Sequence, residues 1–153
     1  MKDKSLAQRL YLDDLEVGQE FLSGEHALDA DQIIAYARQF DPQPFHTDPE
    51  AAQGSFFQGL AASGWHTMSL TMRLLVESVP FAQGVIGAGG EVSWPQPTRP
   101  GDILRVKSRI LEIRPSRSKP DRGLVKVQSL TLNQSDEVLL QLTANLLAFR
   151  KEG

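Results

Sequence analysis

The chain has 153 residues, of which 41% are hydrophobic, and its formal net charge is −3. A chain of this length buries roughly 68–70% of its unfolded surface, which is enough for a single domain with a sizeable core. The mildly acidic charge balance excludes a dedicated nucleic-acid-binding protein. The absence of cysteine excludes disulfides, thiol nucleophiles and cysteine-ligated metal centres.

The N-terminal region predicts neither a targeting segment nor a membrane segment. Residues 1–10 are polar and charged, which predicts a flexible lead-in. The first 18 residues contain no apolar stretch of signal-peptide length, and no run of the chain approaches the roughly 20 apolar residues that a membrane span needs. We therefore expect a cytoplasmic protein without a membrane partner.

The first elements are a short strand and a helix. Residues 13–21 predict a turn followed by a strand. The helix is predicted to begin after Asp29, an N-cap residue with Gln32 at the capping-box position. Its apolar residues recur at helical spacing, at Ile33, Ile34, Ala37 and Phe40. Asp41 ends this helix, because a residue before proline avoids helical geometry.

The next stretch, FDPQPFHTDPEAA (40–52), combines three prolines, three acidic residues and a histidine. This composition is typical of neither a helix nor a central strand. The stretch could be a surface connection stiffened by proline, or it could hold Asp41 and His46 at a fixed separation for proton chemistry. Asp48 before Pro49 predicts the N-cap and the first residue of a short helix.

Residues 64–79 predict a long helix, which Pro80 ends. One side of this helix carries Met68, Met72, Leu75 and Val79, and another side carries Leu70 and Leu74. Because apolar residues occupy more than one stripe, we expect the helix to be buried broadly.

The C-terminal half changes to the period of two that is typical of strands. Four strands are predicted, over residues 89–97, 100–113, 123–134 and 137–149. A basic loop at 114–123 joins the second strand to the third, and a turn at 133–137 joins the third to the fourth. The last of them is apolar on both faces, which predicts a central position in the sheet. The simplest architecture is α+β, with a curved antiparallel sheet wrapped around the long helix.

The order of these motifs resembles the MaoC-like dehydratases, which are relatives of the R-specific enoyl-CoA hydratases. The resemblance covers roughly residues 11–150. It lies in Asp41-x-x-Pro44-x-His46 after a helix, in Ala62-Ser63-Gly64-Trp65 before the long helix, and in the segment VSWPQPTRPGD. The chain departs from the family pattern at Phe40, Gln43, Ser63 and Met72.

The resemblance implies a single hotdog domain over 11–150 and a homodimer or higher homo-oligomer. It also implies an enoyl-CoA hydratase, or 3-hydroxyacyl-CoA dehydratase in reverse, with an acyl-CoA substrate in fatty acid metabolism. An acyl carrier protein could carry the acyl group in place of coenzyme A. Coenzyme A would enter as part of the substrate, and no metal or redox cofactor is required.

Hydration of an enoyl thioester needs a base for water, an acid for the α carbon and donors for the carbonyl oxygen. Asp41 and His46 can supply the base and the acid by holding one water between them. The residues alone leave open which of the two is the base and which is the acid. Gly64 is the candidate oxyanion donor, because backbone N–H groups at a helix N-terminus lack intrahelical partners.

The candidates for substrate binding are Gln43, Phe45, Ser63, Trp65 and Met72. Gln43 could orient the pair or be exposed, and Ser63 could contact the thioester or cap the long helix. The basic loop could meet the phosphates of coenzyme A or be a solvated loop. His66 could border the pocket, and we expect His26 at the surface.

Two other functions compete with hydration. A thioesterase of the same fold would typically use a carboxylate on the long helix, where the sequence offers Glu77 near the C-terminal end. A non-catalytic acyl-CoA-binding protein would explain the departures at Gln43, Ser63 and Met72. The pairing of Asp41 with His46 favours hydration over both.

Overall fold

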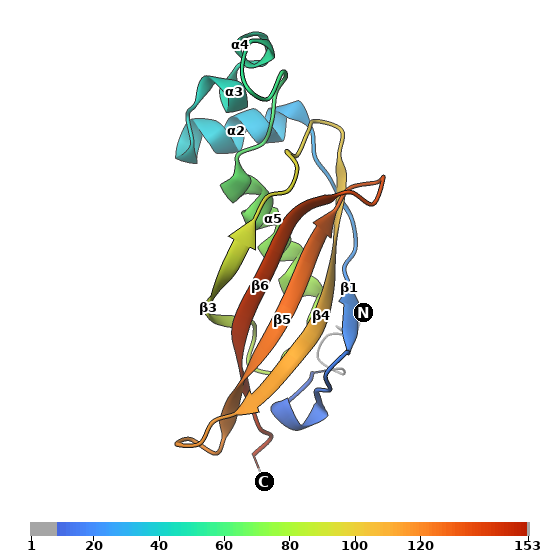
Figure 1. Ribbon diagram of the computed structural model, residues 1–153, viewed down its shortest axis with the longest axis vertical. Helices are drawn as coiled ribbons and strands as arrows, with labels where there is room; N and C mark the ends of the chain where they lie inside the picture. Colours follow the sequence, from blue (N-terminus) through green and yellow to red (C-terminus); the bar gives the residue numbers. More distant parts are fainter. Residues whose placement is uncertain (1–8, 153) are drawn as a thin grey trace, which may run out of the picture.

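The computed structural model describes residues 9–152 of the chain. Figure 1 shows a sheet beside one long helix, with the shorter helices gathered at one end of the molecule. In chain order the elements are η1 (Leu12–Asp14), β1 (Glu20–Leu22), β2 (His26–Ala27), α2 (Ala30–Phe40), α3 (Pro44–Thr47), α4 (Pro49–Gln53), α5 (Gly64–Ser78), β3 (Ile86–Ser93), β4 (Ile103–Pro115), β5 (Arg122–Leu132) and β6 (Val138–Phe149).

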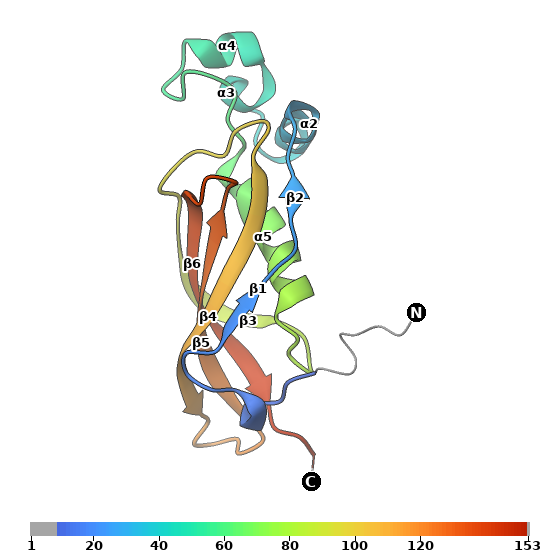
Figure 2. The same ribbon diagram turned by 90° about the vertical axis from the view of Figure 1, so that its right-hand side faces the viewer.

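The sheet is antiparallel and has the strand order β1-β4-β5-β6-β3, with β2 pairing to β4. Figure 2 shows that it curves around α5, which lies against one face. This is the α+β hotdog arrangement that the resemblance implies. The strand β6 lies between β5 and β3, so its apolar character on both faces did indicate an inner strand.

The helix α5 packs on the sheet and on the loop between β3 and β4 through hydroxyl groups as well as apolar side chains. Thr67 Oγ1 lies 2.9 Å from Thr98 Oγ1, and Thr71 Oγ1 lies 2.5 Å from Thr131 Oγ1. The helix is not buried as broadly as expected, because Met72 is 36% exposed and Val76 is 52% exposed. Buried threonines are stable here because each hydroxyl has a hydrogen-bonding partner.

The N-terminal caps of α2 and α4 agree in part with those predicted from the sequence. The Asp29 carboxylate accepts the Gln32 N–H at 2.9 Å, as an N-cap does. The Gln32 side chain donates to the Ala27 carbonyl at 3.1 Å, so the reciprocal half of the capping box is not formed. Asp48 caps α4 as predicted, accepting the Glu50 N–H at 3.0 Å.

Several elements differ from the sequence-based expectation. The stretch predicted to be non-helical contains α3, a single turn with Pro44 at its first position, where the missing N–H costs nothing. The strand predicted at 89–97 is β3, which begins at Ile86 and ends at Ser93, because Pro95 and Pro97 cannot continue a ladder. The elements η1 and β2 were not predicted.

The flexible lead-in predicted at 1–10 lies mostly outside the described residues. Leu10 itself is ordered by backbone pairing, donating to the Pro80 carbonyl at 2.8 Å and accepting from Ala82 at 2.8 Å. Within residues 9–152, none of the helices has both the length and the apolar character needed to cross a membrane.

Candidate active site

Asp41 lies at the C-terminal end of α2. Its N–H donates to the Ala37 carbonyl at 2.8 Å, and Pro42 then stops the helix, so the carboxylate projects from a fixed backbone position. The Gln43 amide donates to Asp41 Oδ1 at 2.6 Å. Of the two readings of Gln43, the structure supports the one in which it orients the pair.

His46 lies on α3 with only 6% of its side chain exposed. Its Nδ1 lies 2.6 Å from the Ala61 carbonyl oxygen. A carbonyl only accepts hydrogen bonds, so Nδ1 carries a proton and donates it. The other ring nitrogen, Nε2, is thereby aimed at Asp41, with Nε2 3.3 Å from Asp41 Oδ2. The acid and the base of the predicted pair are therefore neighbours.

The surroundings of Asp41 keep its carboxylate ionised. Partial burial raises its pKa, but the hydrogen bonds from Gln43 and Ser63 and the positive charge of His46 outweigh that effect. The net result is a pKa below the ordinary value of 3.8. At neutral pH, Asp41 is an anion that can accept a proton.

Gly64 is the first residue of α5, as predicted, and Ser63 is its N-cap. The Ser63 hydroxyl accepts the Trp65 N–H at 3.3 Å. Among residues 9–152, no hydrogen-bond acceptor is present for the Gly64 N–H. An N–H at the positive end of a 15-residue helix is suited to a developing oxyanion.

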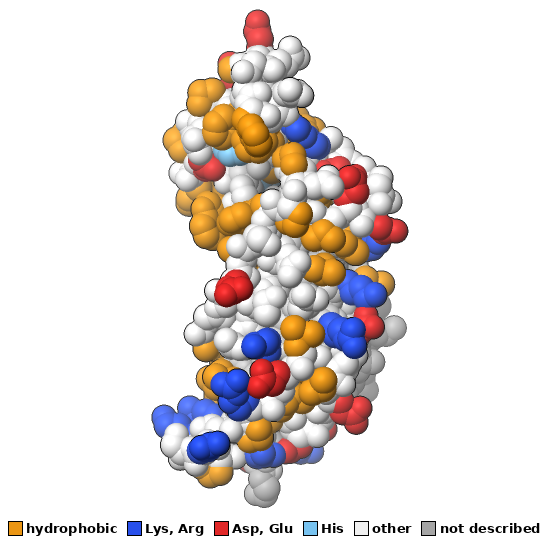
Figure 3. All heavy atoms as spheres, viewed as in Figure 1, with side chains coloured by type: hydrophobic (Ala, Val, Ile, Leu, Met, Phe, Trp, Pro, Cys, Tyr) orange, Lys and Arg blue, Asp and Glu red, His pale blue; other side chains and the backbone are white. Residues whose placement is uncertain are grey.

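The pair and Gly64 face one cavity of about 570 Å³. Its remaining walls come from two loops and from the first turn of α5, namely Phe56, Phe57, Ala62, Trp65, Thr67, Trp94, Pro95, Gln96, Pro97 and Thr98. Figure 3 shows hydrophobic side chains gathered over the helical end of the molecule. An apolar cavity with a few convergent polar groups is the usual form of a small-molecule site.

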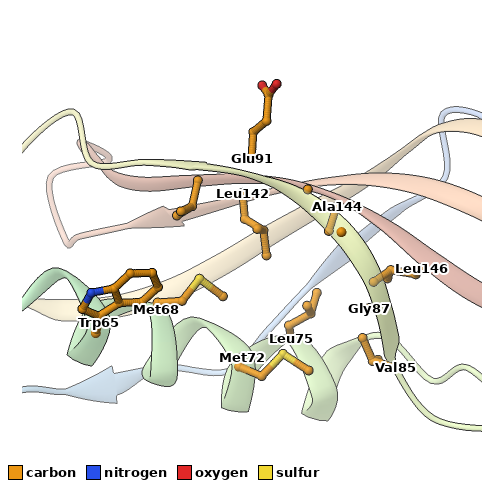
Figure 4. Close-up of a pocket in the computed structure, with 13 residues that line it drawn as sticks. Trp65, Met68, Met72, Leu75, Val85, Gly87, Glu91, Leu142, Ala144 and Leu146 are labelled. Carbon is orange, nitrogen blue, oxygen red and sulfur yellow. The ribbon is translucent and has the colours of Figure 1, made fainter. Parts of the chain in front are cut away.

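A second, apolar cavity of about 360 Å³ lies between α5 and the strands β3 and β6. Figure 4 shows the Met68, Met72 and Leu75 side chains in the space between α5 and the sheet, while Glu91 points away. Met72, a candidate for substrate binding, lines this second cavity and not the one that Asp41 and His46 face. Trp65 lines both cavities.

The other predicted residues have distinct places. Phe45 packs in an apolar cluster. Its ring is nearly perpendicular to that of His46, with the centroids 4.6 Å apart, and it does not line the cavity that Asp41 and His46 face. Ser63 caps α5. His26, expected at the surface, is half-buried, with Nε2 2.7 Å from the Gln32 amide oxygen. Glu77 is exposed and pairs with Arg73 at 3.3 Å.

The basic loop joins β4 to β5 at the end of the sheet opposite the helices (Figure 1), so it is remote from Asp41 of the same chain. Figure 3 shows Lys and Arg side chains gathered there. Two of these cations already have acidic partners, Arg114 with Glu112 and Arg122 with Asp121. Within one chain, the solvated-loop reading fits better than the phosphate-binding one.

His66 lies on α5 away from both cavities. It is buried, stacks on Tyr36 with ring centroids 4.4 Å apart, and its Nδ1 has no hydrogen-bonding partner among the described residues. Burial, with a smaller effect from the charge of His26, lowers the pKa of His66 from 6.5 to about 4. His66 is therefore a neutral core residue near pH 7 and not a pocket residue.

Sequence reasoning missed Trp94, Thr98 and Arg99, which surround the site. The Trp94 indole donates to the Gly64 carbonyl at 2.9 Å, and Thr98 is buried against Thr67. Trp94 was assigned to the strand predicted at 89–97, and Thr98 and Arg99 fell between that strand and the next. The two prolines between Trp94 and Thr98 were the signal that the chain leaves the sheet there.

The fold agrees with comparisons with known proteins. The family model of the MaoC like domain matches residues 14–132, so the chain belongs to the MaoC-like dehydratase family. A crystal structure of the MaoC-like dehydratase from Rhodospirillum rubrum is similar, with 56% identity and a TM-score of 0.93, covering 94% of this chain and 99% of that one.

Two curated proteins are also similar. An uncharacterized protein of Bacillus subtilis (strain 168) is 31% identical over 128 residues, which is 82% of this chain and 89% of that protein. A 3-hydroxybutyryl-CoA dehydratase of Methylorubrum extorquens is 28% identical over 145 residues, covering 94% of this chain and 87% of that protein.

Proposed function

We propose that this protein adds water to a trans-2-enoyl thioester and removes it from the 3-hydroxyacyl thioester in the reverse direction. The observation that carries the proposal is the Asp41–His46 pair. Its facing atoms, Oδ2 and Nε2, lie 3.3 Å apart at the wall of a cavity that the Gly64 N–H also borders. The 3-hydroxybutyryl-CoA dehydratase relative supports a thioester of coenzyme A as substrate.

The hydrogen bonds support a separate role for each residue of the pair. Because Nδ1 of His46 donates to Ala61, a second proton on Nε2 makes the ring a cation that can donate to Asp41. Asp41, whose pKa is lowered, is the base that takes a proton from water as the water oxygen attacks the β carbon. His46 then gives its Nε2 proton to the α carbon. Transfer of the proton from Asp41 to His46 restores the starting state.

The Gly64 N–H would stabilise the thioester oxygen, which gains negative charge as the double-bond electrons move away from the β carbon. An oxyanion donor of this kind contributes about 2.7–4 kcal/mol in the transition state of a well-studied enzyme. Gln43 acts through Asp41, and Ser63 acts through the α5 N-terminus and Asp41. Both are therefore positioning residues in this proposal.

The acyl chain would extend past Trp65 into the apolar cavity beneath β3. Trp65 borders both spaces, and Met68, Met72 and Leu75 give the second space an apolar lining. Met72 would contact the chain away from the reacting carbons. Phe45 would support the His46 ring and not touch substrate.

We also propose that a second copy of the chain pairs along β3. This strand is an edge of the sheet, and seven of its eight residues are exposed. A long exposed edge strand is a template for pairing with another chain. Size-exclusion chromatography with light scattering should give about twice the chain mass of 16.9 kDa, and a monomer would contradict this pairing.

The alternatives have less support in the site. The only carboxylate offered to a thioesterase by α5 is Glu77, which is exposed and paired with Arg73. A non-catalytic binding protein would not need the Nδ1 hydrogen bond that aims His46 at Asp41.

The test is the loss of enoyl-thioester absorbance when the purified protein meets crotonyl-CoA, with Asp41→Asn as the control. Hydration by the wild type that falls at least about 100-fold in the variant supports the proposal. Chiral analysis of the product should give the R-3-hydroxyacyl form, as the resemblance implies. Release of free coenzyme A would favour a thioesterase. No reaction with crotonyl-CoA or with longer and branched enoyl-CoAs would favour a binding protein.

A further inference from the structure

The chain segment just before Ala61 is held by one guanidinium group. Arg99 donates through one nitrogen to the carbonyls of Gly59 and Leu60, at 3.0 and 3.3 Å, and through another to the carbonyl of Phe57 at 2.5 Å. Arg99 is itself fixed, because its N–H donates to the carboxylate of the buried Asp102 at 2.8 Å. One side chain therefore satisfies three backbone carbonyls.

The backbone conformation of residues 57–60 is stabilised by a nearby positive charge. Gln58 has φ 55° and Gly59 has φ 155°, and this backbone turns the three carbonyl oxygens toward a common point. Converging carbonyl dipoles repel one another unless positive charge lies between them. Within residues 9–152, Arg99 forms no ion pair with a carboxylate side chain, so its charge is balanced by these carbonyls.

The held segment leads directly to the hydrogen bond that orients His46. Ala61 follows Leu60, is completely buried, and donates its N–H to the Phe45 carbonyl at 3.2 Å. Its carbonyl accepts from His46 Nδ1 at 2.6 Å. The next residue, Ala62, is tied to the other side of the site by its N–H, which donates to the Thr98 carbonyl at 2.9 Å.

We propose that Arg99 is a positioning residue for His46, an inference that rests on the proposed function. Its guanidinium fixes residues 57–60, and these place the Ala61 carbonyl that keeps the proton on Nδ1 and aims Nε2 at Asp41. Lysine cannot replace it fully, because an ammonium group lacks the planar fork that reaches carbonyls on two sides. Arg99 touches no reacting atom, so its loss should change the chemical step more than substrate binding.

The experiment compares wild type, Arg99→Met and Arg99→Lys with crotonyl-CoA, using Arg150→Met as the matched control. Arg150 also ties loops together, donating to the Pro120 carbonyl at 3.0 Å and pairing with Asp13. We expect Arg99→Met to lower kcat about 10- to 100-fold, with KM changed less than about threefold. The kcat of Arg99→Lys should lie between those of wild type and Arg99→Met. Arg150→Met should keep kcat within about twofold of wild type.

A second readout does not depend on activity. In ¹⁵N-histidine spectra, with the His46 signals assigned by their loss in His46→Ala, wild type should show a proton held on Nδ1, and Arg99→Met should lose this signature. A kcat for Arg99→Met within about twofold of wild type, or an unchanged Nδ1 signal, overturns the proposal. If Arg99→Met does not fold, Arg99→Lys decides on the same two readouts. If wild type hydrates no enoyl thioester, the proposed function fails, and the spectra still decide whether Arg99 orients His46.

Discussion

The indole of Trp94 lies directly against Gly64, at the point where α5 begins. Its Nε1 donates to the Gly64 carbonyl at 2.9 Å, and a Cβ atom on residue 64 would lie 2.8 Å from the Trp94 ring. A glycine is therefore required at this position for packing, apart from any contact with substrate.

We expect Gly64→Ala to displace the Trp94 ring or the start of α5. A displacement of about 1 Å at the oxyanion donor should lower kcat for crotonyl-CoA hydration about 100-fold. Gly24→Ala is the control for stability, because a Cβ there meets no atom within 4 Å. Equal activity of Gly64→Ala and wild type would show that the helix start tolerates the shift.

The pH dependence should report the hydrogen bond from Gln43 to Asp41. Gln43→Leu removes one of the contacts that lower the Asp41 pKa, so this pKa should rise. Because Asp41 must be ionised to act as base, the acid limb of kcat/KM should move to higher pH. The control is Gln39→Leu, a change at an exposed residue of α2. Coincident acid limbs for Gln43→Leu and wild type would argue against Asp41 as the base.

Acid should weaken the fold through His66. Its folded pKa is about 4 and its ordinary value is 6.5, so between these values the unfolded chain binds a proton that the folded chain does not. The contribution of His66 to the free energy of unfolding is therefore complete above pH 6.5 and is lost as the pH falls toward 4. We expect a loss of roughly 1–3 kcal/mol over this range, after allowance for screening.

His66→Phe should keep the stacking on Tyr36 and remove this titration. Urea unfolding at pH 7.5 and pH 5 measures the difference for wild type and variant. The free energy of unfolding of the variant should fall less between the two pH values. The same fall in both proteins would mean that other groups cause the acid sensitivity.

Acyl-chain preference should respond to the apolar cavity beneath β3. Gly87 lines this cavity, and its backbone does not have the positive φ that would disfavour a side chain. Gly87→Val should fill part of the space, so the ratio of kcat/KM for decenoyl-CoA to that for crotonyl-CoA should fall about tenfold. An unchanged ratio would place the acyl chain elsewhere. A matched change on the outer face of the sheet, Glu91→Gln, should leave the ratio as it is.

The sequence located the elements well where one local signal dominates. The caps at Asp29 and Asp48, the stop at Asp41-Pro42 and the start at Gly64 are each decided by a few neighbouring residues. For Asp41 and His46 the residues left two readings open, and the resemblance to the family favoured the acid–base pair. The single turn of α3 brings the two side chains within 3.3 Å of each other.

The remaining parts of the site depend on contacts between residues distant in sequence. Thr67 and Thr71 are polar by type, and only the hydroxyls of Thr98 and Thr131 explain why these two residues are buried while Met72 is partly exposed. Arg99 is more than thirty residues from every carbonyl that its side chain contacts. No local pattern indicates such pairings.

The two cavities are built from different parts of the chain and meet at Trp65. The proposed catalytic groups come from the helical end, residues 41–64, and the proposed acyl cavity is formed by α5 and the strands β3 and β6. Substitutions that enlarge or shrink the second cavity can therefore accumulate without disturbing the proton-transfer groups. A scaffold divided in this way allows related enzymes to diverge in the size of molecule they accept while retaining one reaction.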